Sequence, residues 1–460
     1  MKTILAFFGS VIFCLCACVE EIQAHTYQAA SCSYADVSAA INDASPGDTV
    51  YVPTGNCTWT YPLKITKGVN MIGAGIGNTV ITNSSSCGLG FDGQYWLQYN
   101  PSDYSLDAPF RLSGFTFNLN NTCRGLALGQ TGKSAPFAAQ TKVRVDHNRW
   151  LNPKSGSAQY IWHAGGIYGV IDSNIFESCY YPVKADTSAD CSYWNQFTYT
   201  PGAEDDNMCF EDNTFNGISG CVTDCQWSGR YVYRYNDFKI TAGQWSMFDM
   251  HGNGPSYGMC SCFGGEIYGN DITGSYDIRL LDHRGGQAMV FYNRASTSLG
   301  YQIQVREEYA DSVNPPATAA DGQPQHVSDS YYWNNRKGAG ALNTVIEGEH
   351  VGDIPLANRD FFSHASAFNG QSGVGCGTVA QMQAITTCEE GVGFWATNQS
   401  CTDLSNVVGV NPITPISGAL YRCNSSSKWE LHYVPLAYPH PLRGETGLAA
   451  PAGLKVISPK

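Results

Sequence analysis

The sequence predicts an all-β fold in which one chain winds into a parallel β-helix. The leading observation is an asparagine that returns after each of a series of short β-rich runs. The intervals are 26, 39, 23, 34, 23 and 41 residues, between Asn148, Asn174, Asn213, Asn236, Asn270, Asn293 and Asn334. Internal repeats with a period of roughly 20 to 50 residues indicate stacked or radial architectures. We interpret the longer intervals as the same repeat carrying an inserted loop.

The residues around each asparagine favour stacked strands over the blades of a propeller. The preceding runs, such as Tyr231 to Tyr235 and Met289 to Tyr292, are rich in aromatic and β-branched residues, as strands are. Asparagine tolerates a left-handed backbone and suits a tight turn, and stacked turns would let the asparagine amides bond one another. A propeller blade needs four strands and about 40 residues, which the shorter intervals do not provide.

Composition and charge agree with a turn-rich β-protein and exclude one class of partner. The chain has 460 residues, of which 49 are glycine and only 14% are charged. A solenoid grows by adding repeats, so this length fits one domain. The net charge of −13 argues against nucleic acid as a partner and against a broadly basic surface.

The N-terminal segment predicts export. A short polar start precedes an apolar run from Ile4 to Val19, which is typical of a secretory signal and too short for a transmembrane segment. We predict a signal peptide over residues 1–24 and a secreted, monomeric mature chain that begins at His25. A lipobox-like motif leaves a second prediction open, an outer-surface lipoprotein anchored through Cys18.

The cysteine count also indicates an oxidising compartment. The chain has 18 cysteines, and removal of the signal peptide takes away three of them and leaves 15. That number in an exported chain predicts several disulfides and at least one remaining thiol. Zinc is less favoured because no paired Cys-x-x-Cys set occurs.

The sequence predicts a capping helix first, then the coil, and then a segment without the repeat pattern. Ser33 precedes apolar residues at helical spacing up to Ile41, and this helix would cover the open end of the coil. We expect the β-helix domain over residues 25–340. Residues 341–443 contain four cysteines and few periodic strands, so they are expected to form a disulfide-tied covering segment, and residues 444–460 a tail.

The start of the coil resembles a known superfamily. Val37 to Ile41, Pro46 to Pro53 and Gly73 to Gly75 look like the amino-terminal entry of the pectate-lyase-like superfamily, whose members are single-stranded right-handed parallel β-helices. With the asparagine repeats, the resemblance covers roughly residues 32–340. It implies the fold but not the activity, because the superfamily includes polysaccharide lyases, glycoside hydrolases, epimerases, esterases, phage tailspikes and non-catalytic adhesins.

Residues at a fixed distance after each asparagine should line up on another face of the coil. Counting 12 to 15 positions onward collects, in place of aliphatic and hydroxyl residues, His163, Trp227, His251, His283, Arg284 and Arg306. A saccharide cleft uses these residue types for stacking and polar contact. The Asp249–His251 and Asp282–Arg284 motifs each end a strand in a glycine-rich loop, one repeat apart, which is about 4.8 Å. We expect both motifs to face one substrate.

These positions predict a lyase that cleaves a uronate-containing polysaccharide by β-elimination. Arg284, helped by Arg279 or Arg306, would neutralise the substrate carboxylate, since guanidinium groups suit oxyanions. His251 would remove the C5 proton, and His283 or a nearby tyrosine would protonate the leaving oxygen. The predicted catalytic residues are His251, Arg284, His283 and Asp249, and the predicted substrate contacts are Arg279, Arg306, His163, Trp227 and Tyr257.

Calcium is the one cofactor that the sequence leaves open. In many β-helix lyases, calcium and a lysine or arginine base share this chemistry, but neither motif here contains a lysine. The acidic run from Glu204 to Asp206 is the candidate calcium-binding edge.

Three other functions remain as alternatives. A glycoside hydrolase would use Asp249 with Asp282 or Glu266 as paired carboxylates, although the polygalacturonase motifs are not reproduced. A non-catalytic surface protein would bind glycans without cleaving them. A copper site at an amino-terminal His25 would need a second histidine nearby.

Overall fold

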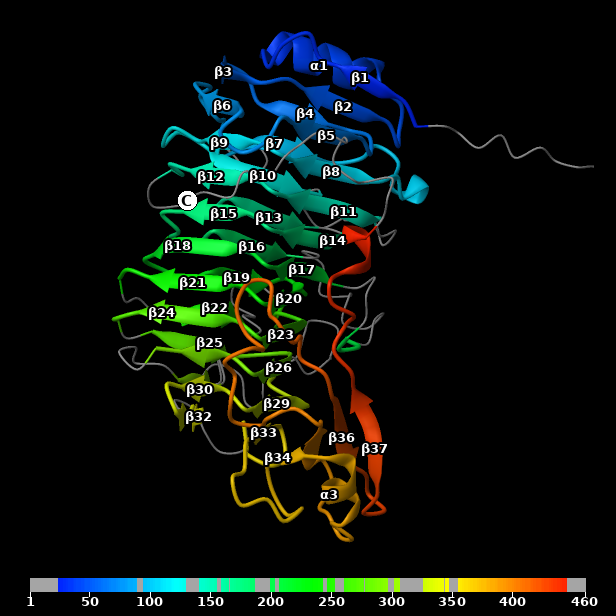
Figure 1. Ribbon diagram of the computed structural model, residues 1–460, viewed down its shortest axis with the longest axis vertical. Coiled ribbons are helices and arrows are strands. Elements are labelled where there is room, and N and C mark those ends of the chain that lie inside the picture. The colour runs from blue at the N-terminus through cyan, green and yellow to red at the C-terminus, as the bar shows by residue number, and fades with distance from the viewer. Residues whose placement is uncertain are drawn as a thin grey trace, which may run out of the picture.

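The chain coils through three long β-sheets that run the length of an elongated molecule (Figure 1). The structure is a computed structural model. It describes residues 24–88, 94–129, 140–154, 159–164, 166–186, 199–202, 207–242, 246–252, 260–276, 278–296, 302–306, 326–342, 344–346 and 355–444. The strands within each long sheet pair in parallel, except for one short antiparallel pair at the end of the second sheet. The predicted all-β parallel β-helix is therefore confirmed.

Successive turns of the coil add strands to each sheet in the same order. Sheet A pairs β1 (Thr26–Gln28), β2 (Thr49–Val52), β5 (Asn70–Gly73), β8 (Phe110–Ser113), β11 (Gln140–Asp146), β14 (Ile167–Asp172), β17 (Met208–Glu211), β20 (Arg230–Arg234), β23 (Gly264–Tyr268), β26 (Gln287–Phe291), β29 (Ser330–Trp333) and β33 (Phe361–Ser363). Sheet B pairs β3 (Gly55–Trp59), β6 (Thr79–Asn83), β9 (Thr116–Asn118), β12 (Arg149–Leu151), β15 (Ile175–Glu177), β18 (Thr214–Ile218), β21 (Asp237–Ile240), β24 (Asp271–Gly274), β27 (Arg294–Ala295), β30 (Arg336–Lys337) and β31 (Gly340–Ala341). Sheet C pairs β4 (Leu63–Ile65), β7 (Tyr95–Tyr99), β10 (Arg124–Leu128), β13 (Ile161–Ala164), β16 (Val183–Asp186), β19 (Thr223–Gln226), β22 (Ser246–Met250), β25 (Arg279–His283), β28 (Ile303–Val305) and β32 (Thr344–Ile346).

The recurring asparagine builds the tight corner between sheet A and sheet B. The Nδ2 of Asn148 donates to the Oδ1 of the next asparagine, and the pattern repeats with distances of 3.2, 3.0, 3.1, 3.0, 2.9 and 2.8 Å through Asn174, Asn213, Asn236, Asn270, Asn293 and Asn335. The predicted amide ladder is therefore confirmed. The left-handed backbone belongs to the residue before each ladder asparagine, for example Ser173 with φ of 57° and Asn334 with φ of 53°. Asn335, not Asn334, is consequently the last ladder residue.

Aromatic rings fill the inside of the coil along sheet B. Phe117 packs on Trp150 with ring centroids 4.7 Å apart, and the file continues through Phe176, Phe215 and Phe238, where the next separations are 6.5, 4.8 and 4.9 Å. All five side chains are buried. Because in-register neighbours on adjacent strands pack face to face, this file fixes the vertical alignment of the rungs.

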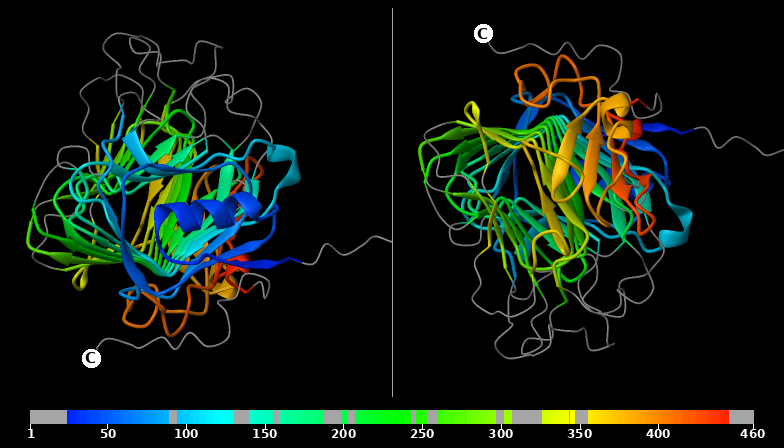
Figure 2. Two further views of the ribbon diagram at one scale, coloured as in Figure 1. Left: turned by 90° about the horizontal axis from the view of Figure 1, so that it is seen from above. Right: turned by 90° about the horizontal axis from the view of Figure 1, so that it is seen from below.

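The predicted capping helix is present at the N-terminal end. Helix α1 (Tyr34–Asp43) starts at Ser33, whose side chain accepts a hydrogen bond from the N–H of Asp36, and it buries Val37 and Ile41. Viewed along the coil, α1 lies across the first rungs (Figure 2, left). A solenoid needs such a cover over its first hydrophobic layer.

The parallel sheets continue past residue 340, where the sequence placed the domain boundary. Strands β32 and β33 extend sheets C and A beyond that point. β32 completes the turn that begins at Asn335, whereas no ladder asparagine follows β33, so the repeat pattern gave no sign of this last strand. A separate C-terminal sheet follows, made of β34 (Val374–Gly377), β35 (Gly393–Ala396), β36 (Ala419–Cys423) and β37 (Trp429–Tyr433), with the short helices α3 (Val379–Gln383) and η4 (Pro441–Arg443). A further short helix, η2 (Tyr104–Leu106), lies earlier in the coil.

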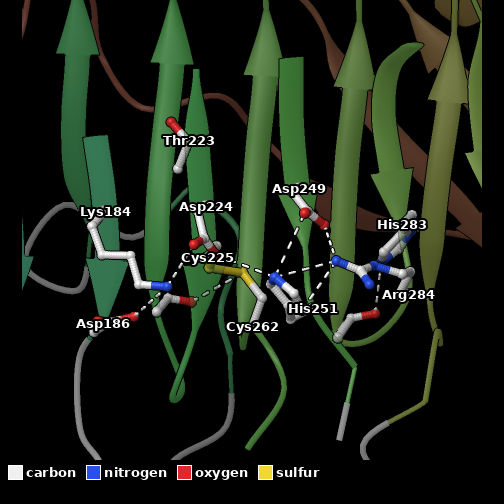
Figure 3. The surroundings of a disulfide bond; sticks show 12 residues. Lys184, Asp186, Thr223, Asp224, Cys225, Asp249, His251, Cys262, His283 and Arg284 are labelled. Carbon is white, nitrogen blue, oxygen red and sulfur yellow. Dashed lines mark hydrogen bonds and ion pairs between the residues drawn. A yellow bond between two sulfur atoms is a disulfide. The ribbon is translucent and has the colours of Figure 1, made fainter. Parts of the chain in front are cut away.

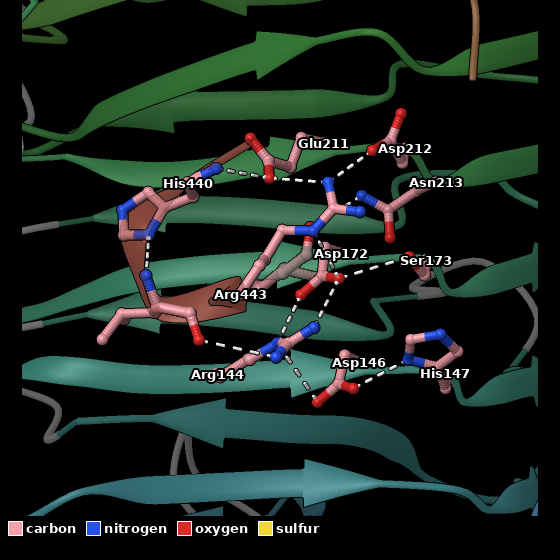
Figure 4. A network of polar contacts seen from close by, with 12 residues as sticks. Arg144, Asp146, His147, Asp172, Ser173, Glu211, Asp212, Asn213, His440 and Arg443 are labelled. Atoms are coloured by element: carbon pink, nitrogen blue, oxygen red, sulfur yellow. Dashed lines mark hydrogen bonds and ion pairs between the residues drawn. The ribbon is translucent and has the colours of Figure 1, made fainter. Parts of the chain in front are cut away.

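The C-terminal segment covers the outer face of sheet A and is fixed there by buried charges (Figure 4). The guanidinium of Arg443 lies 3.3 Å from Asp172 and 2.8 Å from Glu211, and it also pairs with Asp212. The backbone N–H of His440 donates to Glu211 at 3.0 Å. Breaking a buried pair of this kind leaves an uncompensated charge, which costs about 3–5 kcal/mol. Along this stretch the outer face of sheet A is covered by the C-terminal segment (Figure 4).

The cysteines agree with the predicted disulfides and leftover thiol. Disulfides join Cys32 to Cys57, Cys87 to Cys123, Cys225 to Cys262, Cys376 to Cys401 and Cys388 to Cys423. Cys260 is also disulfide-bonded. Among the described cysteines, Cys179 and Cys221 are free and buried. Disulfides in this number are consistent with an exported protein, while the signal peptide and Cys18 lie outside the described residues. Over the part of the chain that is described, no helix is both long and apolar enough to span a membrane.

Candidate functional site

The outer face of sheet C carries two adjacent columns of charged residues at the carboxyl ends of its strands (Figure 3). Register pairing of β16, β19, β22 and β25 aligns the first column, Lys184, Asp224, Asp249 and Asp282. The second column lies two residues further along each strand, on the same face because side chains alternate. It consists of Asp186, Gln226, His251, Arg284 and Arg306. We refer to the charged members of both columns, with Arg279, as the sheet C cluster.

The last residues of the second column lie just beyond their strands, yet their backbones keep the parallel pattern. The N–H groups of His251, Arg284 and Arg306 donate at 3.0 Å to the carbonyls of Cys225, Met250 and His283, respectively. The backbone of each of the three residues is therefore held by the rung that precedes it.

Lys184 bridges two carboxylates at the N-terminal end of the cluster. Its Nζ lies 2.7 Å from Asp224 and 3.9 Å from Asp186, and its side chain is only 7% exposed. Burial disfavours the charge of Lys184, but the two aspartates raise its pKa above the ordinary value. Gln226 joins this group, because in the amide orientation that satisfies its neighbours its oxygen accepts from Lys184 at 2.8 Å and from the Nε1 of Trp227 at 3.2 Å. Trp227 thus borders the cluster.

Asp186 and Asp224 have pKa values displaced in opposite directions. Burial, reinforced by Asp224 and opposed by Lys184, raises the pKa of Asp186 to about 6. One oxygen of Asp186 accepts from the Nε1 of Trp162 at 3.1 Å, and the other is buried with no hydrogen-bond partner in the described structure. Burial also acts on Asp224, but Lys184 and His251 outweigh it and hold the pKa of Asp224 well below its usual range. Near or below pH 6, Asp186 carries a proton while Asp224 stays ionised.

His251 occupies the centre of the cluster between two carboxylates. Its Nε2 lies 3.3 Å from Asp224 and 3.5 Å from Asp249, and the Nη2 of Arg284 lies 3.0 Å from its Nδ1. The backbone around it is fixed on both sides, because the N–H of Cys262 donates to the carbonyl of His251 at 2.9 Å and Cys262 is disulfide-bonded to Cys225. Its side chain is 20% exposed, so the imidazole is held in place but remains accessible to solvent.

Arginine–carboxylate pairs form the C-terminal end of the cluster. Arg284 pairs with Asp249 and lies 3.7 Å from Asp282. Arg306 grips Asp282 with both arms of its guanidinium, at 3.0 and 2.8 Å, and Arg279 lies 3.8 Å from the same carboxylate. Arg279 and Arg306 are the most exposed cations of the cluster, at 30% and 23%. Burial, with further contributions from Asp224 and Asp282, raises the pKa of Asp249 against the opposing charges of His251 and Arg284.

Charge within the cluster is balanced only when every aspartate is ionised. It contains four permanent cations, Lys184, Arg279, Arg284 and Arg306, and four aspartates, Asp186, Asp224, Asp249 and Asp282. When Asp186 holds its proton, near or below pH 6, the cluster has an excess of positive charge. A site of this kind suits an anionic ligand.

Three members of the cluster were missed from the sequence. Asp186 lies 12 positions after Asn174, within the interval that collected the other candidates, so extending the count to that repeat would have found it. Lys184 and Asp224 belong to the column two residues earlier, which alternation along a strand would have indicated. The lysine that both motifs lack is therefore supplied by a neighbouring rung.

Two predicted histidines lie inside the coil, away from the cluster. His163 and His283 belong to the inward column with Ala185, Cys225 and Met250, and both are fully buried. His283 is hydrogen-bonded to the hydroxyl of Tyr332 at 2.6 Å and to the carbonyl of Gly286 at 3.1 Å, and His163 to the carbonyl of Ile167. Burial lowers the pKa of each to about 4. The sequence predicted both histidines on the face that carries His251 and Arg284. They lie one position along the strand from that column, and a shift of one position places a side chain on the opposite face. We give neither a role in the chemistry.

The remaining predicted residues are distributed as follows. Glu266 lies on sheet A, where it accepts from Tyr433 at 2.6 Å and from the N–H of Gly202 at 2.6 Å, so it cannot pair with Asp249. Tyr257 and the run Glu204 to Asp206 lie outside the described residues. No group of three or more His, Cys, Asp or Glu side chains within the described ranges is arranged to hold a metal ion. This leaves calcium binding and a copper site at His25 without support from the described geometry.

Comparison with known proteins identifies no family. No protein-family model and no curated protein sequence matches this chain. Among solved structures, the chain is similar to one described as Geobacillus virus E2 ORF18, at 14% sequence identity and a TM-score of 0.32, over 86% of this chain and 72% of that one. A similarity of this extent assigns neither a family nor an activity.

Proposed function

We propose that this protein is an exported enzyme that cleaves a uronate-containing polysaccharide by β-elimination at the sheet C cluster. The observation that carries the proposal is the position of His251, between Asp224 and Asp249 and beside Arg284, on a face that also presents Arg279 and Arg306. β-Elimination needs a base, a cation for the substrate carboxylate and a proton donor, and this face holds all three types of group.

In this mechanism His251 removes the proton at C5 of the uronate. Asp224 and Asp249 lie 3.3 and 3.5 Å from its Nε2, where a carboxylate stabilises the charge that the ring gains when it takes up a proton. Their hydrogen-bonding positions also fix the ring, so that a proton taken at one nitrogen is stabilised by the carboxylates around it. Asp224 and Asp249 are therefore the residues that support His251 as the base.

Arg306 and Arg279, rather than Arg284, neutralise the substrate carboxylate in this mechanism. Arg284 is committed to Asp249 and lies deeper, at 10% side-chain exposure. Arg306 and Arg279 are more exposed, and both contact Asp282, Arg306 from the next rung and Arg279 from the start of β25. A guanidinium next to the C6 carboxylate stabilises the charge that develops when C5 is deprotonated.

Asp186 supplies the proton for the leaving oxygen. With its pKa raised to about 6, it keeps its proton at a pH at which an ordinary aspartate has lost it. The indole of Trp162 fixes one oxygen of this carboxyl. Asp186 takes the role that the sequence assigned to His283.

Glycoside hydrolysis is the second candidate, favoured by one specific observation. Two carboxyl groups with separated pKa values, Asp186 protonated and Asp224 ionised, are the pair that a hydrolase uses as general acid and as base or nucleophile. Lys184 lies between them and would have to move for water or substrate to enter.

The products distinguish the two reactions. Purified protein is incubated with a panel of uronate polymers, and the ultraviolet absorbance of an unsaturated product is followed beside the appearance of reducing ends. Elimination produces both signals together. Reducing ends without the absorbance would assign hydrolysis, and neither signal on any polymer would refute the proposed function.

A further inference from the structure

Away from the sheet C cluster, a pocket lies between the last rungs of sheet B and the C-terminal segment. It has a volume of about 410 Å³ and is lined by Arg294, Arg336, Gly338, Ala339 and residues 402–405. Pockets of roughly 300–1,000 Å³ accommodate small ligands. We call it the sheet B pocket.

Two arginines in register form the charged wall of this pocket. Arg294 on β27 pairs with Arg336 on β30 in the parallel ladder, so their backbones lie about 4.8 Å apart. Two guanidinium groups at adjacent positions repel each other, and an oxyanion placed between them relieves that repulsion.

The two arginines differ in what already neutralises them. Arg294 is gripped by Asp271 through two hydrogen bonds of 3.0 and 2.6 Å. Arg336 donates to the carbonyl of Ala339, but its Nε is buried without a hydrogen-bond partner, and no described carboxylate lies within 4.0 Å of it. A buried guanidinium nitrogen without an acceptor is costly, and a ligand oxygen would satisfy it.

The opposite wall is a loop that is already fixed in shape. The hydroxyl of Ser400 accepts from the N–H groups of Thr402 and Asp403 at 3.2 and 2.9 Å, and Asp403 in turn accepts from the N–H of Ser405 at 3.0 Å. Cys401 is bonded to Cys376, and Leu404 is buried. The carboxylate of Asp403 attracts Arg294 but is exposed to water, which screens its charge, so Arg336 is the cation that remains for a ligand among the described residues of the pocket.

From this arrangement we infer that the sheet B pocket binds the carboxylate of a small acidic sugar. The guanidinium of Arg336 would take the carboxylate, and the hydroxyls of Thr402 and Ser405 would face the sugar hydroxyls. None of the described residues that line the pocket is aromatic, which disfavours a neutral sugar held by stacking. The inference does not depend on the proposed lyase activity, because the pocket uses no residue of the sheet C cluster.

The test is calorimetric titration with galacturonate, with glucose as the neutral probe and sulfate as a competing oxyanion. We expect galacturonate to bind with a dissociation constant of about 1 mM, at least tenfold more tightly than glucose, and to be displaced by sulfate. Arg336→Gln should weaken galacturonate binding at least tenfold. Thr402→Glu, an exposed change that places a carboxylate at the wall, should do the same without depending on the fold of the strand.

The matched control is Arg149→Gln, which removes an arginine from the same outward column of sheet B several rungs away. It should leave galacturonate binding unchanged. A second control introduces Arg336→Gln into a protein that already carries Arg306→Gln in the sheet C cluster. If galacturonate binds in the sheet B pocket, Arg336→Gln should weaken its binding in that protein as well. Equal binding of glucose and galacturonate, or galacturonate binding that Arg336→Gln and Thr402→Glu leave intact, would overturn the inference, whatever the outcome of the cleavage assays.

Discussion

Replacing Asp186 with asparagine should make the protein more stable at alkaline pH while it removes activity. Burial holds the pKa of Asp186 near 6, compared with about 3.9 for an aspartate in an unfolded chain. Above pH 6 this carboxyl is ionised in both states, and the folded state carries the whole cost of the buried charge. Below about pH 4 it is protonated in both states, so the cost vanishes.

The sign and size of the effect follow from that difference. Between pH 4 and pH 6 the folded state binds a proton that the unfolded state does not, so the contribution of Asp186 to the free energy of unfolding falls as pH rises. The displacement from 3.9 to 6 corresponds to about 3 kcal/mol. Asparagine imitates the protonated carboxyl and can still accept from Trp162. Asp186→Asn should therefore raise the free energy of unfolding by about 2–3 kcal/mol at pH 8 and leave it almost unchanged at pH 4.

Urea unfolding followed by tryptophan fluorescence at both pH values measures this difference. Asp224→Asn is the matched control, because the pKa of Asp224 is lowered, so losing its charge should destabilise the folded state at pH 8. Both variants should lose turnover. The reasoning fails if Asp186→Asn is less stable than the wild type at pH 8, or if its effect on stability is the same at pH 4 and pH 8.

Three other predictions follow from the contacts described. Asn236→Ala removes an amide that makes five hydrogen bonds, so chemical denaturation should show a loss of about 3–5 kcal/mol, and a loss below 1 kcal/mol would mean that the ladder is not stabilising. His251→Ala should abolish turnover with little change in melting temperature, whereas His283→Ala, which removes a buried hydrogen-bonded ring, should lower the melting temperature by several degrees; the reverse pattern would contradict their placement. Arg443→Ala should release the C-terminal segment and speed its cleavage in limited proteolysis, and an unchanged digestion rate would show that the ion pairs do not hold it.

The fold was predictable because one residue, the ladder asparagine, marks successive turns of the coil in the sequence. Each ladder asparagine must satisfy the backbone of its own corner and the amide of the next rung, so no other side chain serves, and the series is visible in the sequence. The capping helix was predictable for a similar reason, since Ser33 and the apolar spacing after it are local signals. Strand β33, the last of sheet A, is followed by no ladder asparagine and could not be recognised.

The site was predictable only in part, because its geometry depends on register between rungs. Counting from the asparagines brought His251, Arg284 and Arg306 to one face, but loops of unequal length follow each corner. An error of one position moves a side chain from the outside to the inside, which is what separates His283 from Arg284. Asp186 and Lys184 lie 38 and 40 positions before Asp224, on the preceding rung, so their pairing with it depends on the register between the two strands.

The most direct test of the central proposal is a crystal structure of Asp186→Asn with a bound uronate oligosaccharide. We expect the sugar to lie along the outer face of sheet C, with a carboxylate at Arg306 or Arg279, C5 within reach of His251, and the glycosidic oxygen next to residue 186. An oligosaccharide bound on another face, while the sheet C cluster keeps its internal ion pairs and touches no sugar, would contradict the proposal.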